Sequence, residues 1–320
     1  MAIQLLQHWV TSSLIAALAL VAGSLLIECI LEIRDVARYT PGQTFAKVGR
    51  ARIRYRILGA DRPGATVVIL AGIGGSIEQA EEFQSALSSA VPSLTYDRAG
   101  YGFSRGSTAH SAKDQADELA ALLDTLGIEK PIVLVSYSDS DQIARVFVGR
   151  YPAKVASMYL VDPWTPEFYV ISPHDPRRMF VRYVLTTLVK SSLGYPRLMQ
   201  RLHGSQGTGS SVERRANAIL ARRSHYWAQT REWWLTLASA RQTREAPIPA
   251  TVPVETVYPR PAADPISQWM MQLRVEVFAR YPMSRLVEVQ RIKHELLVKP
   301  GPVFDLMVAR IQQLSCLGAR

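Results

Sequence analysis

The stretch from Pro131 to Val148, where a short apolar run turns directly into a helical pattern, most constrains how this chain can fold. Pro131-Ile132-Val133-Leu134-Val135 has the length and composition of a buried strand, and Gln142 to Val148 has helical periodicity. Between them lies Ser136-Tyr137-Ser138-Asp139-Ser140. A serine at such a turn stands clear of the sheet, beside the free N–H groups of the helix start. The stretch therefore predicts a nucleophile elbow with Ser138 at its apex, although serine occupies both glycine positions of the usual G-x-S-x-G pattern.

Further strand patterns flank this stretch and alternate with helical ones. Short apolar runs at Thr66–Leu70, Ser93–Tyr96 and Ser157–Val161 have the character of buried strands, and Ala112–Leu126 has that of an amphipathic helix ending at Gly127. Strands that alternate with helices form a mostly parallel sheet covered on both faces. The pattern predicts an α/β fold.

The alternation stops after about Thr165 and resumes near Thr251. The intervening residues show no strand pattern and are expected to be helical, with Trp227, Trp233 and Trp234 among them. Strand patterns return at Thr251–Tyr258 and Arg285–Val289, before a final helix over Val303–Leu314. We therefore expect four parts: an anchor and linker over 1–40, a first core part over 41–164, a helical cap over 165–247 and a second core part over 248–320.

An alternating pattern at Phe45–Leu58 precedes the first buried strand. Arg52, Arg54 and Arg56 fall on one face of this segment, with aliphatic and aromatic residues on the other. Antiparallel sheets often have one solvated face. The pattern predicts a β-hairpin whose arginines face water.

The N-terminal segment Trp9–Leu31 is predominantly apolar. About 20 such residues suffice to cross a bilayer as a helix, which predicts a membrane anchor. Glu28 is its one acidic interruption, near the end, and no Lys or Arg precedes the run as in a secretory signal. Basic residues that follow the span predict a cytoplasmic body by the positive-inside rule. The alternative is a buried or partner-docking helix.

The composition excludes several classes of function. The formal net charge is +10, but no zinc spacing, aromatic RNA-binding pattern or long basic block indicates a nucleic-acid partner. The two cysteines, Cys29 and Cys316, suggest neither a disulfide framework nor a metal site. We expect no metal and no organic cofactor, and we interpret the charge as a solvated arginine-rich face, which would suit a protein near a membrane.

The chain resembles the α/β-hydrolase fold superfamily, and within it the cap-bearing branch of small esterases, peptidases and dehalogenase-like enzymes. The segments that carry this resemblance are Gly72–Gly75, Tyr96–Ser104, Val133–Ser138, Arg150–Pro163 and the segment around His294. The likeness covers residues 45–164 well and 250–316 moderately. It implies a mostly parallel central sheet flanked by helices, with an inserted helical cap.

The resemblance assigns catalytic roles to residues of this chain. Ser138 holds the position of the nucleophile, and His294 follows a late strand, where the fold delivers the base. Asp162 and Asp264 each follow a strand and keep the order Ser, Asp, His; Asp162 is slightly favoured, because Asp264 needs two extra residues between strand and acid. As alternatives, Asp162 could be a turn residue and Asp264 a helix N-cap.

The remaining site residues also follow from the resemblance. The backbone N–H groups of Ile73 and Asp139 would form the oxyanion hole. Gly72, Gly74, Tyr137 and Trp164 would lie around the substrate. Asp97 and Arg98 would brace loops and take no direct part in chemistry.

These assignments predict a membrane-anchored serine hydrolase that cleaves an ester or related carbonyl bond through an acyl-enzyme. The cap tryptophans and the anchor favour an apolar acyl or lipid-like small molecule as substrate. Two alternatives remain open, a lyase or thioesterase on the same fold and a non-catalytic binding protein. The altered elbow favours the latter, because Asp139 brings a carboxylate close to the expected oxyanion.

Overall fold

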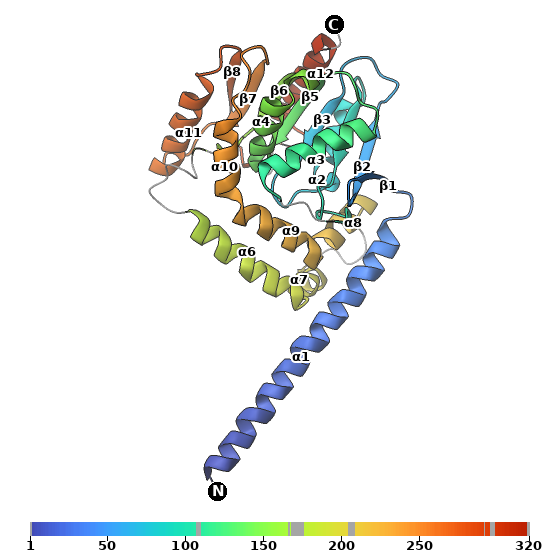
Figure 1. The fold of residues 1–320 in the computed structure, drawn as a ribbon, viewed down its shortest axis with the longest axis vertical. Helices are drawn as coiled ribbons and strands as arrows, with labels where there is room; N and C mark the ends of the chain where they lie inside the picture. The colour runs from blue at the N-terminus through green and yellow to red at the C-terminus, as the bar shows by residue number, and fades with distance from the viewer. Residues whose placement is uncertain are drawn as a thin grey trace.

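The computed structural model describes residues 2–106, 110–165, 167, 176–203, 209–290, 292–294 and 298–318. A mixed β-sheet lies at its centre, with helices on both faces and one long helix projecting from the globular part (Figure 1).

The sheet of the described residues has eight strands in the order β1-β2-β4-β3-β5-β6-β7-β8. β2 runs antiparallel to β1 and β4, and all the other neighbouring strands are parallel. The strand bounds are Thr44–Val48 (β1), Ala51–Leu58 (β2), Val67–Leu70 (β3), Ser93–Tyr96 (β4), Ile132–Tyr137 (β5), Val155–Val161 (β6), Val254–Pro259 (β7) and Ser284–Val289 (β8). This arrangement confirms the predicted α/β fold, including the two late strands.

Helices cover the two faces of the sheet in pairs. α3 (Ala112–Thr125) and α4 (Asp141–Arg150) pack on one face, against side chains such as Val68 and Leu134. α2 (Ile77–Leu87) and α12 (Pro302–Gly318) pack on the other, against Val67 and Val133. Neighbouring residues of one strand thus enter opposite cores, because successive side chains of a strand alternate in direction.

Five helices of the described residues lie between β6 and β7, which confirms the expected helical character of this region. They are α6 (Pro176–Ser192), α7 (Tyr195–His203), α8 (Ser211–Leu220), α9 (Arg223–Trp234) and α10 (Thr236–Glu245). We call them the cap helices. Trp233 of α9 is buried, whereas Trp227 and Trp234 are exposed. α11 (Pro265–Phe278) then links β7 to β8, and the short helical turns η1 (Ser138–Ser140) and η2 (Pro152–Lys154) flank α4.

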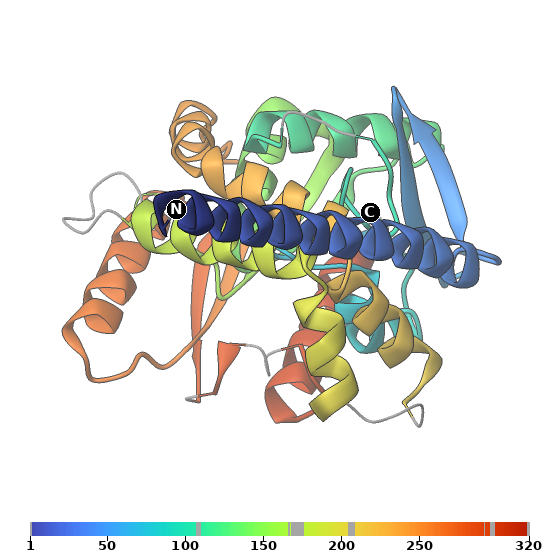
Figure 2. The same cartoon turned by 90° about the horizontal axis from the view of Figure 1, so that it is seen from below.

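Helix α1 spans Ala2–Tyr39. Its N-terminal half projects from the molecule, and its C-terminal half lies along the cap helices, beside α6 (Figures 1 and 2). Over Gln7–Tyr39 it is the one helix of the described residues that is long and apolar enough to cross a membrane, and its most apolar stretch is almost entirely exposed. It is therefore not a buried helix of the core.

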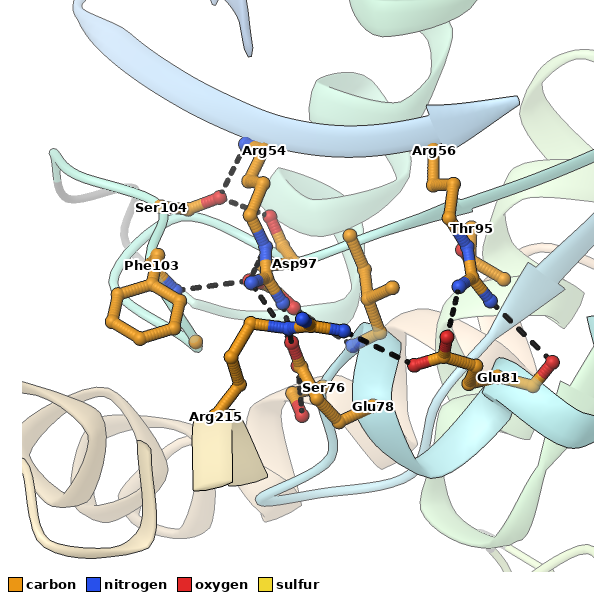
Figure 3. A network of polar contacts seen from close by, with 12 residues as sticks. Arg54, Arg56, Ser76, Glu78, Glu81, Thr95, Asp97, Phe103, Ser104 and Arg215 are labelled. Carbon is orange, nitrogen blue, oxygen red and sulfur yellow. Dashed lines mark hydrogen bonds and ion pairs between the residues drawn. The ribbon is translucent and has the colours of Figure 1, made fainter. Parts of the chain in front are cut away.

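The expectation of a solvated arginine face on the first hairpin is wrong at Arg54. Arg52 is exposed and Arg56 half-buried, but the Arg54 side chain is 0% exposed. It forms ion pairs of 2.6 Å with Glu78 of α2 and 2.7 Å with Asp97 after β4 (Figure 3). Burial alone would raise the pKa of Glu78, but the Arg54 guanidinium outweighs it and lowers that pKa. The predicted alternation of side chains along the strand is correct, but Arg54 is buried because it pairs with carboxylates that are distant in sequence.

Asp97 also holds the backbone of two loops. Its carboxylate accepts hydrogen bonds from the N–H of Ile77, at the start of α2, and from the N–H of Phe103, at 2.9 Å each. The predicted bracing role of Asp97 is confirmed.

Candidate active site

Ser138 follows β5 directly, at the first residue of η1. Its φ is 61°, in the left-handed region that non-glycine residues seldom occupy. Such a backbone costs roughly 1–3 kcal/mol and persists only where the surroundings hold it. β5 therefore turns sharply into η1 and α4, and Ser138 lies at the carboxyl end of β5.

The serines at the two glycine positions are accommodated without unusual backbone angles. Ser136 lies within β5, and Ser140 has a φ of −67°. The buried Ser140 hydroxyl accepts a hydrogen bond from the Tyr137 N–H at 3.0 Å and lies 3.1 Å from the carbonyl of Leu70, at the end of β3. Ser140 thus ties the elbow to the neighbouring strand, which a glycine could not do.

His294 meets Asp162 beside the elbow. Nδ1 of His294 lies 2.6 Å from Oδ2 of Asp162, the residue that follows β6. Arg274 of α11 lies 3.1 Å from the other oxygen of Asp162 and donates to the carbonyl of Pro163 at 2.8 Å. Asp162 is therefore held from two sides, and its φ of 44° shows that this turn also has an unusual backbone.

Tyr137, expected to border the substrate, packs against the histidine. Its ring stacks on that of His294, with the ring centroids 4.5 Å apart, and its hydroxyl donates to the His294 carbonyl at 2.8 Å. These contacts orient the imidazole from the residue adjacent to Ser138.

Asp264 has a different place in the structure. It is the exposed N-cap of α11, where its carboxylate accepts the Ser267 N–H at 2.9 Å. Capping is the alternative that sequence reasoning had kept open for this residue, and the carboxylate that meets His294 is that of Asp162.

The loop after β3 approaches the elbow closely at Gly72. A Cβ on Gly72 would lie 3.1 Å from the Cβ of Ser138, so a side chain there would crowd the serine. Gly74 has a φ of +72°, which suits glycine. The residue types of this loop thus follow from its nearness to Ser138.

His225 of α9 fastens the same loop to the cap helices. Its ring accepts the Gly102 N–H at Nδ1, at 3.3 Å, and its Nε2 lies 3.1 Å from the Gly74 carbonyl. The hydrogen on Nε2 must therefore point to Gly74, and the ring is neutral. Burial, aided by the nearby Arg222, lowers the pKa of His225 to about 4.

Arg98 provides a second fastening between core and cap. It donates to the carbonyls of Ala71 and Gly72, at 2.5 and 3.2 Å, and pairs with Glu232 of α9 at 3.0 Å. Burial would lower the pKa of Arg98, but the Glu232 carboxylate outweighs it and raises the pKa. Tyr101 donates its hydroxyl to the same carboxylate. The predicted bracing role of Arg98 is confirmed.

Ile73 and Asp139, the two expected oxyanion-hole residues, line one small cavity together with Gln142 and Glu232. Its volume is about 10 Å³, room for about one water molecule or one substrate oxygen. Trp164 borders this region, since its backbone N–H donates to the Ser138 carbonyl at 3.3 Å and its side chain packs against the same apolar cluster as Ile73.

Carboxyl groups gather on this side of the elbow. Asp139 and Asp141 are both buried, and Glu232 is balanced by Arg98. Burial raises the pKa of Asp141 well above its usual value, which favours the neutral form of this carboxyl group. The local negative charge is thus smaller than the count of acidic residues suggests.

A larger cavity of about 630 Å³ is lined in part by Tyr137. Its lining is mainly apolar and comes from α2, α8 and the ends of β3, β5 and β6. Phe83, Val135 and Val161 are among the lining residues. It adjoins the elbow through Tyr137 and has the volume of a small-molecule site.

Sequence reasoning missed Arg274, His225 and Glu232. All three lie on helices without a recognisable motif, far along the chain from the groups they contact. No local pattern marks them, and only the packing of α9 and α11 against the core reveals their contacts.

The strand order and the helices on both faces of the sheet define a fold of the α/β-hydrolase class. The family model described as alpha/beta hydrolase fold matches residues 65–247, more than half of the chain. The chain therefore belongs to the alpha/beta hydrolase fold family, and the resemblance seen in its sequence is confirmed.

Individual relatives are more distant. A protein of Pantoea ananatis named "Putative carbamate hydrolase RutD" is 34% identical over 114 residues, covering 35% of this chain and 41% of that protein. The chain thus spans less than half of the length of this curated relative. Among solved structures, a "putative epoxide hydrolase" of Pseudomonas aeruginosa is similar with a TM-score of 0.63 at 15% identity, covering 87% of this chain and 97% of that one. A structure from a study of carboxylesterases of Nitrososphaera gargenis has a TM-score of 0.59 at 17% identity, covering 85% and 98%. These two likenesses concern the fold alone.

Proposed function

We propose that this chain is a membrane-anchored serine hydrolase that cleaves a carboxylic ester or related carbonyl bond. The observation that carries the proposal is the meeting of His294 and Asp162, 2.6 Å apart, beside a serine held at a φ of 61°. A half-buried acid that fixes the tautomer of a histidine near a strained serine is the arrangement used by Ser-His-Asp enzymes. The carbamate hydrolysis in the name of the Pantoea ananatis relative is also carbonyl chemistry.

In the proposed reaction the Ser138 oxygen attacks the carbonyl carbon and its proton passes to Nε2 of His294. Asp162 holds Nδ1–H and stabilises the imidazolium. The backbone N–H groups of Ile73 and Asp139 stabilise the negative oxygen. The tetrahedral intermediate then expels the leaving group, which takes the proton from His294. Water, activated by the same histidine, hydrolyses the acyl-enzyme and restores Ser138.

The substrate class we propose is a small molecule with an apolar acyl chain. The cavity of about 630 Å³ beside Tyr137 supports this, because its lining is mainly apolar. Gly72 lets a substrate carbonyl approach Ser138, and Trp164 borders the same region.

Labelling of the full chain in membranes with a fluorophosphonate probe tests the nucleophile. We expect wild-type protein to be labelled covalently and Ser138→Ala not to be labelled. Ser140→Ala is the matched control, because this neighbouring hydroxyl bonds to backbone groups and should not react. Equal labelling of wild type and Ser138→Ala would overturn the proposal.

Two further variants test the acid. We expect Asp162→Asn to lower kcat by about 10⁴, the effect known for loss of the acid in such a triad. Asp264→Asn should leave kcat within about twofold, because Asp264 caps α11. The opposite ranking would transfer the role to Asp264.

The membrane anchor is the part of the proposal carried by α1. Its apolar, exposed surface over a length sufficient to span a bilayer supports it. The full chain should stay with the membrane fraction after alkaline carbonate extraction, whereas release would refute the anchor. The basic residues after the span support a cytoplasmic catalytic domain, which protease protection of sealed vesicles would test.

A non-catalytic binding protein is the second candidate, favoured by the small cavity at Ile73 and the acidic groups around it. Absence of labelling in a correctly folded wild-type protein would favour this candidate over the hydrolase.

A further inference from the structure

The C-terminal half of α1 carries an acidic stripe that docks on the cap. Glu28, Glu32 and Asp35 lie at helical spacing of four and three residues, so they share one face of α1. Arg197 of α7 binds both Glu28, at 2.8 Å, and Asp35, at 2.6 Å. Arg222, at the start of α9, binds Glu32 at 3.2 Å. Glu28, an interruption in an apolar run, is thus part of a contact between α1 and the cap helices.

This contact fixes where a membrane span can end. Glu28 is buried against Arg197, so the apolar span must lie before it in the chain. The helix from Ala2 to Ile27 is roughly 39 Å long at 1.5 Å per residue, enough to cross a hydrocarbon core of about 30 Å. The junction of α6 and α7, which lies at Glu28, is therefore at the level of the membrane surface.

The helices on both sides of this junction expose several apolar side chains. On α6, Leu185 and Val189 lie one turn apart, 47% and 58% exposed, and Leu193 follows at the same spacing. On α7, Leu198 and Leu202 are 51% and 63% exposed. Figure 1 shows α6 and α7 on the side of the globular part from which the N-terminal half of α1 projects. Solitary exposed apolar residues are ordinary, but rows on two adjoining helices mark an interaction surface.

Basic groups flank these rows. Arg182 and Lys190 of α6 are exposed, and the Lys190 ammonium lies 5.3 Å from the centre of the Tyr195 ring. Apolar rows bordered by lysine, arginine and tyrosine are typical of helices that lie in the interface of an anionic bilayer.

We propose that α6 and α7 form a bilayer-contact surface that lies in the headgroup region of an anionic membrane. The inference rests on the membrane anchor of the proposed function, with which this surface is continuous. The occupant is the bilayer into which α1 inserts: its acyl boundary receives Leu198 and Leu202, and its anionic headgroups meet Arg182 and Lys190. The cap is thereby held against the surface from which an apolar substrate would come.

Site-directed fluorescence quenching tests this surface in the full chain. Single cysteines are introduced into a Cys29→Ser, Cys316→Ser background and labelled with an environment-sensitive fluorophore. The labelled protein is inserted into vesicles of phosphatidylcholine and phosphatidylglycerol. Brominated lipid in these vesicles quenches a fluorophore that contacts the bilayer. Leu198→Cys probes the surface and Leu14→Cys the anchor. Lys130→Cys is the matched control, because it is exposed and precedes β5 at the edge of the sheet opposite Ser138.

We expect quenching of at least about twofold at positions 14 and 198 and none at 130. If the fluorophore at position 14 is quenched but those at positions 198 and 130 are not, the contact surface is overturned and the anchor stands. Quenching at none of the three would refute the anchor and the surface together. Leu202→Cys gives an independent reading if Leu198→Cys does not fold.

The charge requirement is tested separately. Arg182→Gln with Lys190→Gln should reduce the quenching at position 198 in vesicles with phosphatidylglycerol and change it little in vesicles of phosphatidylcholine alone. An equal effect in both lipids, or no effect in either, would overturn the preference for anionic lipid. Leu14→Cys should be quenched equally in every case.

Discussion

Two arginines of this protein each bind two carboxylates, in very different surroundings. Arg54 lies in the sheet core, fully buried, between Glu78 and Asp97 (Figure 3). Arg197 lies on cap helix α7 and binds Glu28 and Asp35 of α1, with 13% of its side chain exposed. The first cluster lies within the core, with Arg215 of α8 added at Glu78, whereas the second joins two elements that could separate.

The difference follows from what surrounds each charge. A charge without water must keep its partners, because an uncompensated buried charge costs several kcal/mol. A charge at the edge of a contact can return to water when its partner leaves. The Arg54 cluster should therefore act as part of the fold, and the Arg197 cluster as a reversible attachment of α1.

The largest effect is expected from Arg54→Met. Loss of the guanidinium leaves Asp97 buried without a cation and leaves Glu78 with Arg215 of α8 alone, so the free energy of unfolding should fall by about 3–5 kcal/mol. Arg56→Met is the matched control on the same strand, where a half-buried ion pair with Glu81 should contribute about 1 kcal/mol or less. Urea unfolding of the full chain in detergent measures both, and equal losses would contradict the comparison.

His225 extends the comparison to a cap side chain that is buried without charge. Its pKa in the folded state is about 4, below the usual 6.5, so between these values the unfolded state binds a proton that the folded state does not. Stability is therefore lost as the pH falls from 6.5 to 4, by about 3 kcal/mol for this shift.

The pH dependence should be measured as the difference between wild type and His225→Gln. The buried Glu118, whose pKa burial raises to about 7, titrates in part of the same range with the opposite sign, and the difference removes its contribution. The free energy of unfolding is plotted against pH for both proteins. If the two plots stay parallel from pH 7 to pH 4, His225 does not titrate as expected.

A smaller effect is expected from Arg197→Met. The contact of α1 with the cap should weaken by about 1–2 kcal/mol, between the values for exposed and buried pairs. Cys29, partly buried next to Glu28, reports this directly: in a Cys316→Ser background its rate of thiol labelling should rise about tenfold. Lys190→Met, directed at the Tyr195 ring, should leave that rate unchanged, and a similar rise in both variants would contradict a specific role for Arg197.

The smallest effect is expected from Arg260→Met. Arg260 and Glu288 form an exposed pair of 2.9 Å, and its loss should change the free energy of unfolding by no more than about 0.5 kcal/mol. A larger loss in urea unfolding would show that exposure does not set the contribution of an ion pair here.

The hairpin and the anchor show how far sequence patterns reached. The alternation of Arg52, Arg54 and Arg56 placed these residues on one side of a strand, because side-chain direction in a strand is local. It could not show that Arg54 is buried, since Glu78 and Asp97 come 24 and 43 residues later in the chain. The apolar length of α1 was likewise visible, but the role of Glu28 depended on Arg197, which is far away in sequence.

The candidate site divides in the same way. Ser138 could be located from adjacent strand and helix patterns, and the glycines after β3 from their place in the chain. The sequence favoured Asp162 over Asp264 only slightly, because each of them follows a strand. The packing of α11, with Arg274 against Asp162 and Asp264 at its N-cap, brings only the former to His294.

The sequence by itself determined the α/β fold, the elbow at Ser138, the helical character of the cap and the apolar length of α1. Each of these depends on periodicity or composition within about 20 neighbouring residues. Only the tertiary structure decided which carboxylate meets His294, that His225 and Glu232 fasten the loop at Gly72, and that α1 docks on α7. Those contacts join side chains distant along the chain, and their energies depend on burial and geometry that no local pattern contains.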